Sequence, residues 1–564
     1  MMKITKQLTS WLAVLMLTLF MASCSKSAPE LVPELSLSTA GDLSFAGNSS
    51  SSSFRIVSNT DWVIATSQPW CTVNPASGNG NANISLSIAK NNALEQRSAS
   101  VTVTAGSLSK NFNVIQAAGD SLNIAVSEYN LAQAGGEITV SFLTSGNYTV
   151  TVNDSWITKN AAKSLSNKSE SFTIAPNKSI FKRNGTITFT TGVTSKTVSV
   201  SQTGLSLTIA DDITGVPSDA KTLVSKMKLG WNLGNSLEAP SSETAWGNPA
   251  TTQQFITSVK NAGFNAIRIP CAWNSYVANE ATLQIKESWL NRVKEVVDYC
   301  YANDMYVIIN IHWDGGWLEN NPFYAKQEIV NNKQRIFWEQ IAVNFRDYDE
   351  HLLFAGTNEV HADYGTPTTE HITVQQSFNQ TFVNTVRSTG GKNGYRNLIV
   401  QTYNTNIDHG VNFMTMPTDR VPDRLIVEVH YYDPWDFAGQ EDSGYKTQWG
   451  AGYTDVSTWG QEDYLINQFK KVKTKFIDKN IPVILGEYGA TRRSNLTGEA
   501  LTKHIESRNY YLKTVTATAV ANGIVPFIWD NGATGNNGMA IFNRNNGNVV
   551  YPDMLQAIKE GAVK

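Results

Sequence analysis

The sequence predicts an α/β fold: a (β/α)8 TIM barrel preceded by two all-β, immunoglobulin-like sandwich domains. Residues 35–203 are rich in Ser, Thr, Asn and Val and contain short alternating strands broken by Gly and Asn. From about residue 210, helical periods alternate with short apolar runs, which is typical of repeated βα units around a parallel sheet. At 564 residues, the chain is long enough for two to four domains.

The N-terminal segment is typical of a signal peptide. Two lysines precede an apolar stretch over residues 11–22, which is too short to span a bilayer. The Met-Ala-Ser-Cys that follows resembles a bacterial lipobox and implies a lipid on Cys24. We expect residues 1–23 to be a lipoprotein signal peptide and 24–34 a linker, in an exported protein anchored to the bacterial outer membrane. Plain secretion is the alternative, and periplasmic or surface display is left open.

Composition argues against a nucleic-acid partner, because 45 Lys and Arg against 48 Asp and Glu leave no basic excess. The 15 tryptophans include flat faces that suit sugar rings, although most are expected in the core. Cys71, Cys271 and Cys300 lack metal-ligand spacing and are expected to be buried free thiols. We expect a monomer.

The β-rich region contains an internal duplication. Similar residues recur 86 positions apart: Trp62 with Tyr148, Trp70 with Trp156, Asn91 with Asn177, Arg97 with Arg183, and Gln116 with Gln202. Each copy has the size of a small sandwich, so we place the two domains at residues 35–118 and 119–204.

The repeated pattern, W-x(20)-N-x(5)-R followed by V-x-Q, resembles the BACON module of Bacteroidetes carbohydrate enzymes. The resemblance covers both copies, although the second lacks the Pro-Ala-Ser-Gly of residues 75–78. The family name implies glycan binding. Trp70 and Trp156 are instead expected to fill the two cores, which favours a spacer role over a binding role.

Eight apolar runs are predicted to be the barrel strands. They cover residues 229–233, 266–268, 307–312, 352–359, 398–401, 425–430, 483–487 and 526–529. Amphipathic stretches such as 289–302, 333–345, 377–386 and 464–476 lie between them and are expected to be helices. Eight units over about 350 residues fit a TIM barrel with extended loops, so residues 205–564 are assigned to it.

Polar residues stand where six of these runs end. The interior of a TIM barrel is packed with side chains, and its sites lie at the carboxyl ends of the strands. We therefore expect eight side chains to face one mouth: Arg268, His312, Asn358, Glu359, His430, Tyr432, Glu487 and Trp529.

Glu359 and Glu487 form the pair that glycosidic bond cleavage requires. One carboxylic acid protonates the leaving oxygen, and a second carboxylate stabilises or attacks the sugar carbon. Either glutamate alone would more often be an ion-paired structural residue. Glu428 is a rival carboxylate, because it shares a strand face with His430, but it lies deeper and is expected to be a buried structural acid.

The histidines do not predict a metal site. His312, His361 and His430 lack the HExxH spacing of zinc enzymes and have no paired cysteines nearby. No metal or other cofactor is therefore expected.

The barrel motifs resemble glycoside hydrolase family 5, closest to its subfamily 4. GWNLGN with ETAWGNP, RIP, NIHWDG, NE, HYYDPWDF, GEYGA and PFIWD follow one another over the whole barrel. The resemblance implies that Glu359 is the acid/base and Glu487 the nucleophile. It further implies that the substrate is bound by Arg268, His312, Asn358, His430, Tyr432 and Trp529. Two departures from the family pattern, Ala355 in place of Glu and Val360 in place of Pro, put the local support of Glu359 in question.

The chemistry sets a requirement for each residue. Glu359 must start protonated, so its pKa is expected to be raised by poor solvation and by the charge of Glu487. Arg268 is expected to keep Glu487 anionic, Tyr432 to donate a hydrogen bond to it, and Asn358 to bind the sugar 2-hydroxyl.

The expected protein is a retaining, endo-acting β-1,4-glycanase for a glucan backbone such as xyloglucan, a cellulose-like chain or mixed-linkage glucan. Xylanase and β-mannanase are alternatives within the family. A surface glycan-binding lipoprotein that does not cut is the non-enzyme alternative. Trp313, Trp317 and Trp435 are further candidates for stacking on sugars, with a packing role equally open.

Overall fold

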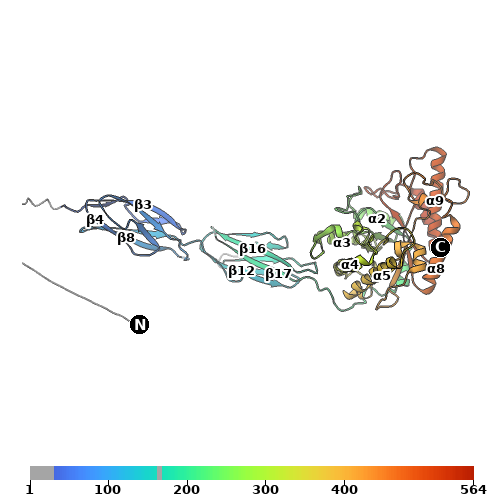
Figure 1. Cartoon of the computed structure of the whole chain (residues 1–564), viewed down its shortest axis with the longest axis horizontal. Helices are drawn as coiled ribbons and strands as arrows, with labels where there is room; N and C mark the ends of the chain where they lie inside the picture. The colour runs from blue at the N-terminus through green and yellow to red at the C-terminus, as the bar shows by residue number, and fades with distance from the viewer. Residues whose placement is uncertain (1–30, 94, 162–167, 193, 564) are drawn as a thin grey trace, which may run out of the picture. The chain divides into compact units, whose positions relative to one another are not determined.

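The computed structural model describes residues 31–93, 95–161, 168–192 and 194–563. The predicted signal peptide, Cys24 and most of the predicted linker lie outside these ranges. Among the described residues, no helix combines the length and the apolar character needed to cross a membrane. Two β-sandwiches and a barrel follow one another along the chain (Figure 1).

The first sandwich has a four-stranded and a five-stranded sheet. The order in the smaller sheet is β1 (Leu35–Leu37), β3 (Ser50–Ser58), β7 (Ala82–Ile88) and β5 (Cys71–Asn74). The larger sheet runs β2 (Leu43–Phe45), β9 (Leu108–Gln116), β8 (Arg97–Ala105), β4 (Asp61–Thr66) and β6 (Ser77–Asn79). Burial alternates along β3, β7 and β8, so the inner faces of the two sheets form an apolar core.

The second sandwich has two four-stranded sheets. One runs β10 (Leu122–Ile124), β12 (Gly136–Thr144), β15 (Ser169–Ile174) and β14 (Ile157–Lys159). The other runs β11 (Glu128–Leu131), β17 (Thr194–Gln202), β16 (Arg183–Thr191) and β13 (Thr149–Val152). The same period-two burial along β12 and β16 makes this an all-β module, as the sequence predicts.

The polar residues of the duplication tie strands together in both modules. Arg97 Nε donates to Gln116 Oε1 at 2.9 Å, and Gln116 Nε2 donates to three backbone carbonyl groups. Arg183 and Gln202 repeat this bond at 2.8 Å, again with three carbonyl acceptors for the amide. A fully bonded buried polar network favours one core arrangement. These repeated residues therefore have a structural role.

The prediction that Trp70 and Trp156 fill the cores was wrong. Both are only half-buried, and the guanidinium of Arg97 lies 4.3 Å from the centre of the Trp70 ring. Trp62 is the tryptophan buried in the first core. The repeated Trp and Arg are kept together in the first module by a cation–π contact at the edge of the core.

Eight parallel strands close the barrel in chain order. They are β18 (Gly230–Leu233), β19 (Ala266–Ile269), β22 (Tyr306–Asn310), β23 (Leu352–Ala355), β24 (Leu398–Gln401), β25 (Leu425–Tyr431), β26 (Val483–Tyr488) and β27 (Val525–Asp530). Pairing of β27 with β18 completes the ring. Each strand coincides with a predicted run, which confirms the fold class.

Two predicted runs extend beyond their strands. β22 ends at Asn310 and β23 at Ala355, so His312 and Glu359 stand on loops. After β23 the backbone leaves the ladder, because the N–H of Thr357 donates to the side chain of Gln401 on β24 instead of to the backbone of that strand. The apolar pattern of the sequence therefore did not predict that the strand ends at Ala355.

Helices cover the barrel between the strands (Figure 1). They are α1 (Ala220–Lys226), α2 (Gln253–Asn261), α3 (Glu287–Tyr301), α4 (Tyr324–Asn344), α5 (Thr369–Ser388), α6 (Ile407–Phe413), α7 (Trp435–Ala438), α8 (Glu462–Lys475), α9 (Gly498–Ala521) and α10 (Pro552–Gly561). The four stretches predicted as helices fall in α3, α4, α5 and α8. A short hairpin, β20 (Val277–Asn279) and β21 (Gln284–Ile285), precedes α3.

The barrel interior is an apolar layer that includes Ile308, Leu353, Ile399 and Ile484. Ala355 belongs to the same layer. Val360 is buried in a separate cluster with Leu318, Val330, Val374 and Phe378 beside the Glu359 loop. Both departures from the family pattern are therefore apolar packing positions. Cys71, Cys271 and Cys300 are buried free thiols, as predicted.

Candidate active site

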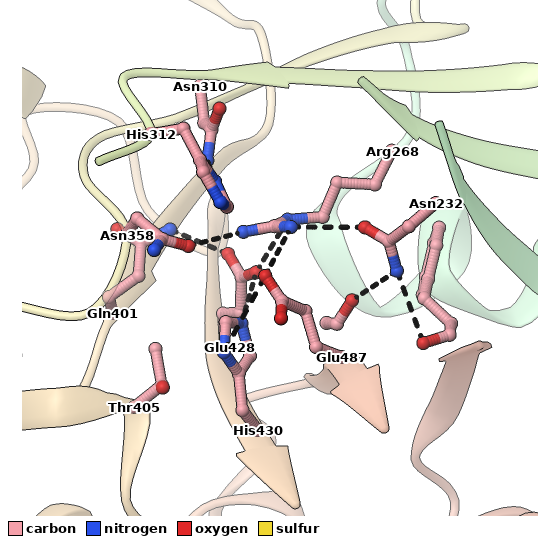
Figure 2. A network of polar contacts seen from close by, with 12 residues as sticks. Asn232, Arg268, Asn310, His312, Asn358, Gln401, Thr405, Glu428, His430 and Glu487 are labelled. Atoms are coloured by element: carbon pink, nitrogen blue, oxygen red, sulfur yellow. Dashed lines mark hydrogen bonds and ion pairs between the residues drawn. The ribbon is translucent and has the colours of Figure 1, made fainter. Parts of the chain in front are cut away.

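Arg268 is the centre of a buried polar network at the carboxyl rim of the barrel (Figure 2). Its Nη1 donates to Glu487 Oε1 at 2.8 Å and to Asn232 Oδ1 at 3.0 Å. Its Nη2 donates to Asn358 Oδ1 at 2.8 Å, and its Nε forms an ion pair of 2.9 Å with Glu428 Oε1. One planar guanidinium thus orients groups from four different strands and loops.

Glu487 lies on β26 with its side chain 8% exposed. Besides the Arg268 bond at Oε1, its Oε2 accepts a hydrogen bond of 3.0 Å from the Tyr432 hydroxyl. A larger residue before it would collide with Glu428, because a Cβ on Gly486 would lie 2.0 Å from Glu428 Oε1. β26 therefore passes directly over the Arg268–Glu428 pair, and this brings Glu487 to the guanidinium.

Glu359 lies four residues past the end of β23 with its side chain 30% exposed. Its Oε1 is 2.6 Å from His430 Nδ1 and 3.4 Å from Thr405 Oγ1. Thr405 has a φ of 47°, which is unusual for a β-branched residue and marks a strained loop at the site.

Glu359 and Glu487 face each other across the mouth. One carboxylate oxygen of each, together with His430, falls in a group whose atoms lie within 4.8 Å of one another. In the part of the chain that the structure describes, this is the one group of three or more His, Cys, Asp or Glu side chains close enough for a metal. The Arg268 cation already neutralises Glu487 there and would repel a metal cation.

His430 bridges two carboxylates. Its Nδ1 faces Glu359, and its Nε2 is 3.2 Å from Glu428 Oε1. Since carboxylates accept hydrogen bonds, both ring nitrogens donate and the imidazole is protonated. Burial lowers the pKa of His430, but the charge of Glu487 and the bonds to Glu359 and Glu428 outweigh it and raise this pKa to about 10.

The expected raised pKa of Glu359 was wrong for the free protein. Burial does raise it, but the short bond and charge of His430, with Arg268, outweigh burial and leave the pKa of Glu359 below its ordinary value. Burial and the charge of Glu359 raise the pKa of Glu487 above its ordinary value, against His430, Arg268 and Tyr432. The proton that Glu359 would deliver is therefore held with His430 as a pair.

His312 and Trp529 lie side by side, with ring centres 5.9 Å apart and planes within 9°. Asn310 Nδ2 donates to His312 Nδ1 at 3.2 Å, because Asn310 Oδ1 already accepts from the N–H of Cys271. Burial, with the charges of Arg268 and His430, holds the pKa of His312 well below its ordinary value. Neutral His312 thus carries its proton on Nε2 and has a free donor.

A cleft of about 770 Å³ opens beside the two glutamates. It runs over the carboxyl ends of β24 to β27 and is lined by Glu359, Glu487, His430, Tyr432 and Trp529. On the Glu359 side it extends between the loop after β24 and α8. Its lining there includes Asp408, Asp433, Tyr464 and Gln468, together with the buried Tyr431, whose hydroxyl has no hydrogen-bond partner.

All eight predicted mouth residues lie at the same rim: seven are in the Arg268 network or on the cleft wall, and His312 stacks beside Trp529. The sequence analysis missed Asn232, Thr405 and Glu319, which contact these residues, and Gln401, which donates to Glu428. Asn232 is the residue before the last in the first strand run, so the rule that places polar strand ends at the mouth would have indicated it. Glu319 lies in an irregular loop, and no periodic pattern indicates it.

The three further tryptophans differ. Trp435 is 55% exposed and lines the cleft. Trp313 is 40% exposed on the loop after β22. Trp317 is half-buried, donates its indole N–H to Asp314 and packs edge-on against Phe337, so it has a packing role.

Comparison with known families agrees with this geometry. The model of cellulase, glycosyl hydrolase family 5, matches residues 232–535, more than half of the chain. The chain belongs to glycoside hydrolase family 5. A model described as a putative N-terminal binding domain (BACON) matches residues 60–117, and a viral BACON domain model matches 121–205. As a family 5 enzyme the protein is a glycoside hydrolase, so the glycan-capture alternative is set aside.

Relatives of this family 5 enzyme include a xyloglucan-specific endo-β-1,4-glucanase of Bacteroides ovatus, 39% identical over 78% of this chain and 92% of the relative. Among solved structures, a Bacteroides ovatus family 5 xyloglucanase in complex with a XXXG heptasaccharide matches with a TM-score of 0.61 and 34% identity, over 94% of this chain and 100% of that one. A broad-specificity subfamily 4 endoglucanase from Clostridium cellulovorans matches with a TM-score of 0.55 and 32% identity, over 61% and 97%.

Proposed function

We propose that the protein is an endo-acting β-1,4-glucanase that retains anomeric configuration, with Glu359 as acid/base and Glu487 as nucleophile. The observation that carries this proposal is the approach of the two carboxylates within 4.8 Å at one mouth. Retaining enzymes hold their carboxyl groups about 5 to 5.5 Å apart, whereas inverting enzymes leave roughly 6.5 to 9.5 Å for a water.

In the first step a Glu487 oxygen attacks the anomeric carbon. The glycosidic C–O bond breaks as Glu359 transfers its proton to the leaving oxygen, and a glycosyl ester of Glu487 forms. Arg268 and Tyr432 fix the attacking carboxylate by hydrogen bonds to its two oxygens. His430 shares its proton with Glu359, since the two side chains are in contact at 2.6 Å.

In the second step Glu359, now a carboxylate, takes a proton from water. The water oxygen attacks the anomeric carbon and releases Glu487. Two inversions give net retention. Asn358 donates to the sugar 2-hydroxyl, His312 Nε2 donates to the same ring, and Trp529 stacks on it.

We propose xyloglucan as the preferred backbone, with mixed-linkage and cellulose-like glucans next and xylan or mannan behind. Support comes from the names of two relatives and from the extension of the cleft toward Tyr431 and Asp433, which gives a branched chain room for a side-chain sugar. Because this extension lies on the Glu359 side, it belongs to the leaving-group half of the substrate.

The test is hydrolysis of xyloglucan, barley glucan, carboxymethyl cellulose, xylan and mannan, with the first-formed anomer followed by proton NMR. The proposal expects β-anomer product and a rapid fall in chain length on at least one glucan. An α-anomer as first product, or release of single sugars from chain ends, contradicts it.

We also propose export and anchoring through a lipid on Cys24, with the sandwiches at residues 35–118 and 119–204 acting as spacers for a monomeric enzyme. The structural role of Arg97 and Gln116, and the Arg97 guanidinium that covers the Trp70 ring, support the spacer role. Affinity electrophoresis of residues 35–204 in gels containing xyloglucan tests it, because retardation would indicate glycan binding.

A further inference from the structure

Glu319 is a buried carboxylate behind the proposed acid. It lies on the loop between β22 and α4 and is only 5% exposed. Its Oε2 accepts from Asn358 Nδ2 at 3.0 Å and from the backbone N–H of Glu359 at 3.2 Å. Its own carbonyl oxygen accepts from the N–H of His361 at 2.9 Å. One residue therefore makes three bonds to the segment that carries Glu359.

This segment needs such support because it is outside the sheet. β23 ends at Ala355, and the last bonds to the neighbouring strand region are made by Gly356 and Thr357. Among the described residues, the Glu359 side chain forms hydrogen bonds only with His430 and, at 3.4 Å, with the Thr405 hydroxyl. Glu319 thus holds the backbone of Glu359 itself, while the next residue, Val360, accepts from the N–H of Asn404 at 2.9 Å.

Glu319 also fixes the orientation of the Asn358 amide. Arg268 has only donors, so it takes Asn358 Oδ1, and the Glu319 carboxylate has only acceptors, so it takes one N–H of Nδ2. Flipping the amide would oppose donor to donor and acceptor to acceptor. One N–H of Asn358 is left, and it is the one that the proposed function assigns to the sugar 2-hydroxyl.

A third contribution is electrostatic. Burial and the charge of Glu359 raise the pKa of Glu319 to about 7, against the two N–H donors. The interaction is mutual, since an anionic Glu319 disfavours a second negative charge on Glu359. The charge of Glu319 thus acts against the effect of His430 on Glu359, and it favours the protonated Glu359 that the first step requires.

We infer that Glu319 is a positioning residue that aims Glu359, fixes the Asn358 amide and places a second negative charge beside the proposed acid. The inference rests on the proposed function and goes one step beyond it. Glu319 itself does not touch the substrate.

The experiment compares Glu319→Gln, Glu319→Ala and a control, Glu350→Gln, in the full chain. Glu350 is another partly buried carboxylate, and it accepts from Ser218 at the opposite end of the barrel. For each variant, kcat/KM is measured against pH on xyloglucan or barley glucan and on 2,4-dinitrophenyl β-cellobioside, whose leaving group needs no proton. Melting temperature reports folding.

For Glu319→Gln we expect kcat/KM on glucan to fall about tenfold or more and its alkaline limb to move to lower pH. The fall on the dinitrophenyl substrate should be smaller. Glu319→Ala, which removes both acceptor bonds, should lose more than Glu319→Gln on both substrates. Glu350→Gln should keep the wild-type rate and pH profile.

Wild-type kinetics and an unmoved alkaline limb in Glu319→Gln would overturn the inference. So would equal losses on both substrates that follow a lower melting temperature. Glu359→Gln separates this failure from that of the proposed function: if Glu359→Gln is inactive on glucan while Glu319→Gln is normal, only the positioning role fails. If Glu359→Gln retains activity on glucan, the proposed function fails as well.

Discussion

At the scale of single residues, the site is a set of interacting charges rather than a pair of isolated acids. Three carboxylates, Glu359, Glu428 and Glu487, share Arg268 and His430 as cations. Burial would force protons onto these acids if they were alone. The two cations allow the carboxylates to stay ionised. One proton is shared between His430 and Glu359.

The way in which these residues share charge and a proton predicts how activity depends on pH. Because the pKa of Glu487 is raised, kcat/KM should fall on the acid side as the nucleophile becomes protonated. Because His430, with a pKa of about 10, holds the proton of the acid pair, activity should persist into mildly alkaline solution and fall as the pair loses that proton.

The variant His430→Gln tests this distribution. Removing the imidazole leaves Glu359 alone to hold the proton, so the alkaline limb of kcat/KM should move to lower pH, and the maximum should fall by roughly a hundredfold. The measurement is a pH series of initial rates on a soluble glucan. An alkaline limb at the wild-type position would show that His430 does not share the proton.

At the scale of elements, strand geometry decides which side chains meet. β26 brings Glu487 over the Arg268–Glu428 pair only because position 486 has no side chain. The loop after β24 brings Thr405 to Glu359 through two residues with positive φ, Asn404 and Thr405. The barrel thus supplies a rigid floor, and irregular loops complete the site on it.

Gly486→Ala is expected to disturb this approach. The added methyl would lie 2.0 Å from Glu428 Oε1, so β26 or Glu428 must shift, at a cost of about 1–3 kcal/mol in stability. Urea unfolding and kcat/KM on a glucan measure both effects. Gly535→Ala is the control, since nothing lies within 4 Å of its added methyl. Equal stability and activity in the two variants would contradict the close packing at position 486.

Tyr431→Phe tests the cleft extension. Tyr431 is one of the residues that line the cleft, and its buried hydroxyl has no hydrogen-bond partner in the structure. If a side-chain sugar of xyloglucan bonds to it, the variant should lose about 1 kcal/mol, roughly fivefold in kcat/KM, on xyloglucan. Barley glucan, which is unbranched, should be cut at the wild-type rate. Equal effects on the two polysaccharides would argue against a side-chain site there.

At the scale of the whole molecule, two structural modules precede a catalytic one. The repeated Arg and Gln residues hold sandwich strands together, whereas every residue of the proposed chemistry lies in the barrel. This separation suits an enzyme that acts at a distance from its attachment point, which we propose to be a lipid on Cys24.

Cys24→Ser is expected to abolish attachment. In a bacterial host fed labelled palmitate, the wild-type chain should take up label and sediment with membranes, and the variant should do neither. Activity on a soluble glucan should be the same for both, because the change lies far from the barrel in sequence. Label in the Cys24→Ser chain would contradict lipidation at this position.

Much of this arrangement could be predicted from sequence. The barrel strands are regular apolar runs, and a polar residue at the end of such a run nearly always faces the mouth. Three features could not be predicted. The pKa direction of Glu359 depends on the orientation of His430, Glu319 arrives on a loop without periodicity, and Trp70 sits at a core edge beneath Arg97. Each depends on contacts between segments far apart in the chain.

The most direct test of the account is azide rescue of Glu487→Gly on 2,4-dinitrophenyl β-cellobioside, with the product anomer assigned by proton NMR. If Glu487 is the nucleophile, its removal opens space on the α face, and azide should yield the α-cellobiosyl azide. The β-azide, or turnover near the wild-type rate without azide, would contradict the assignment.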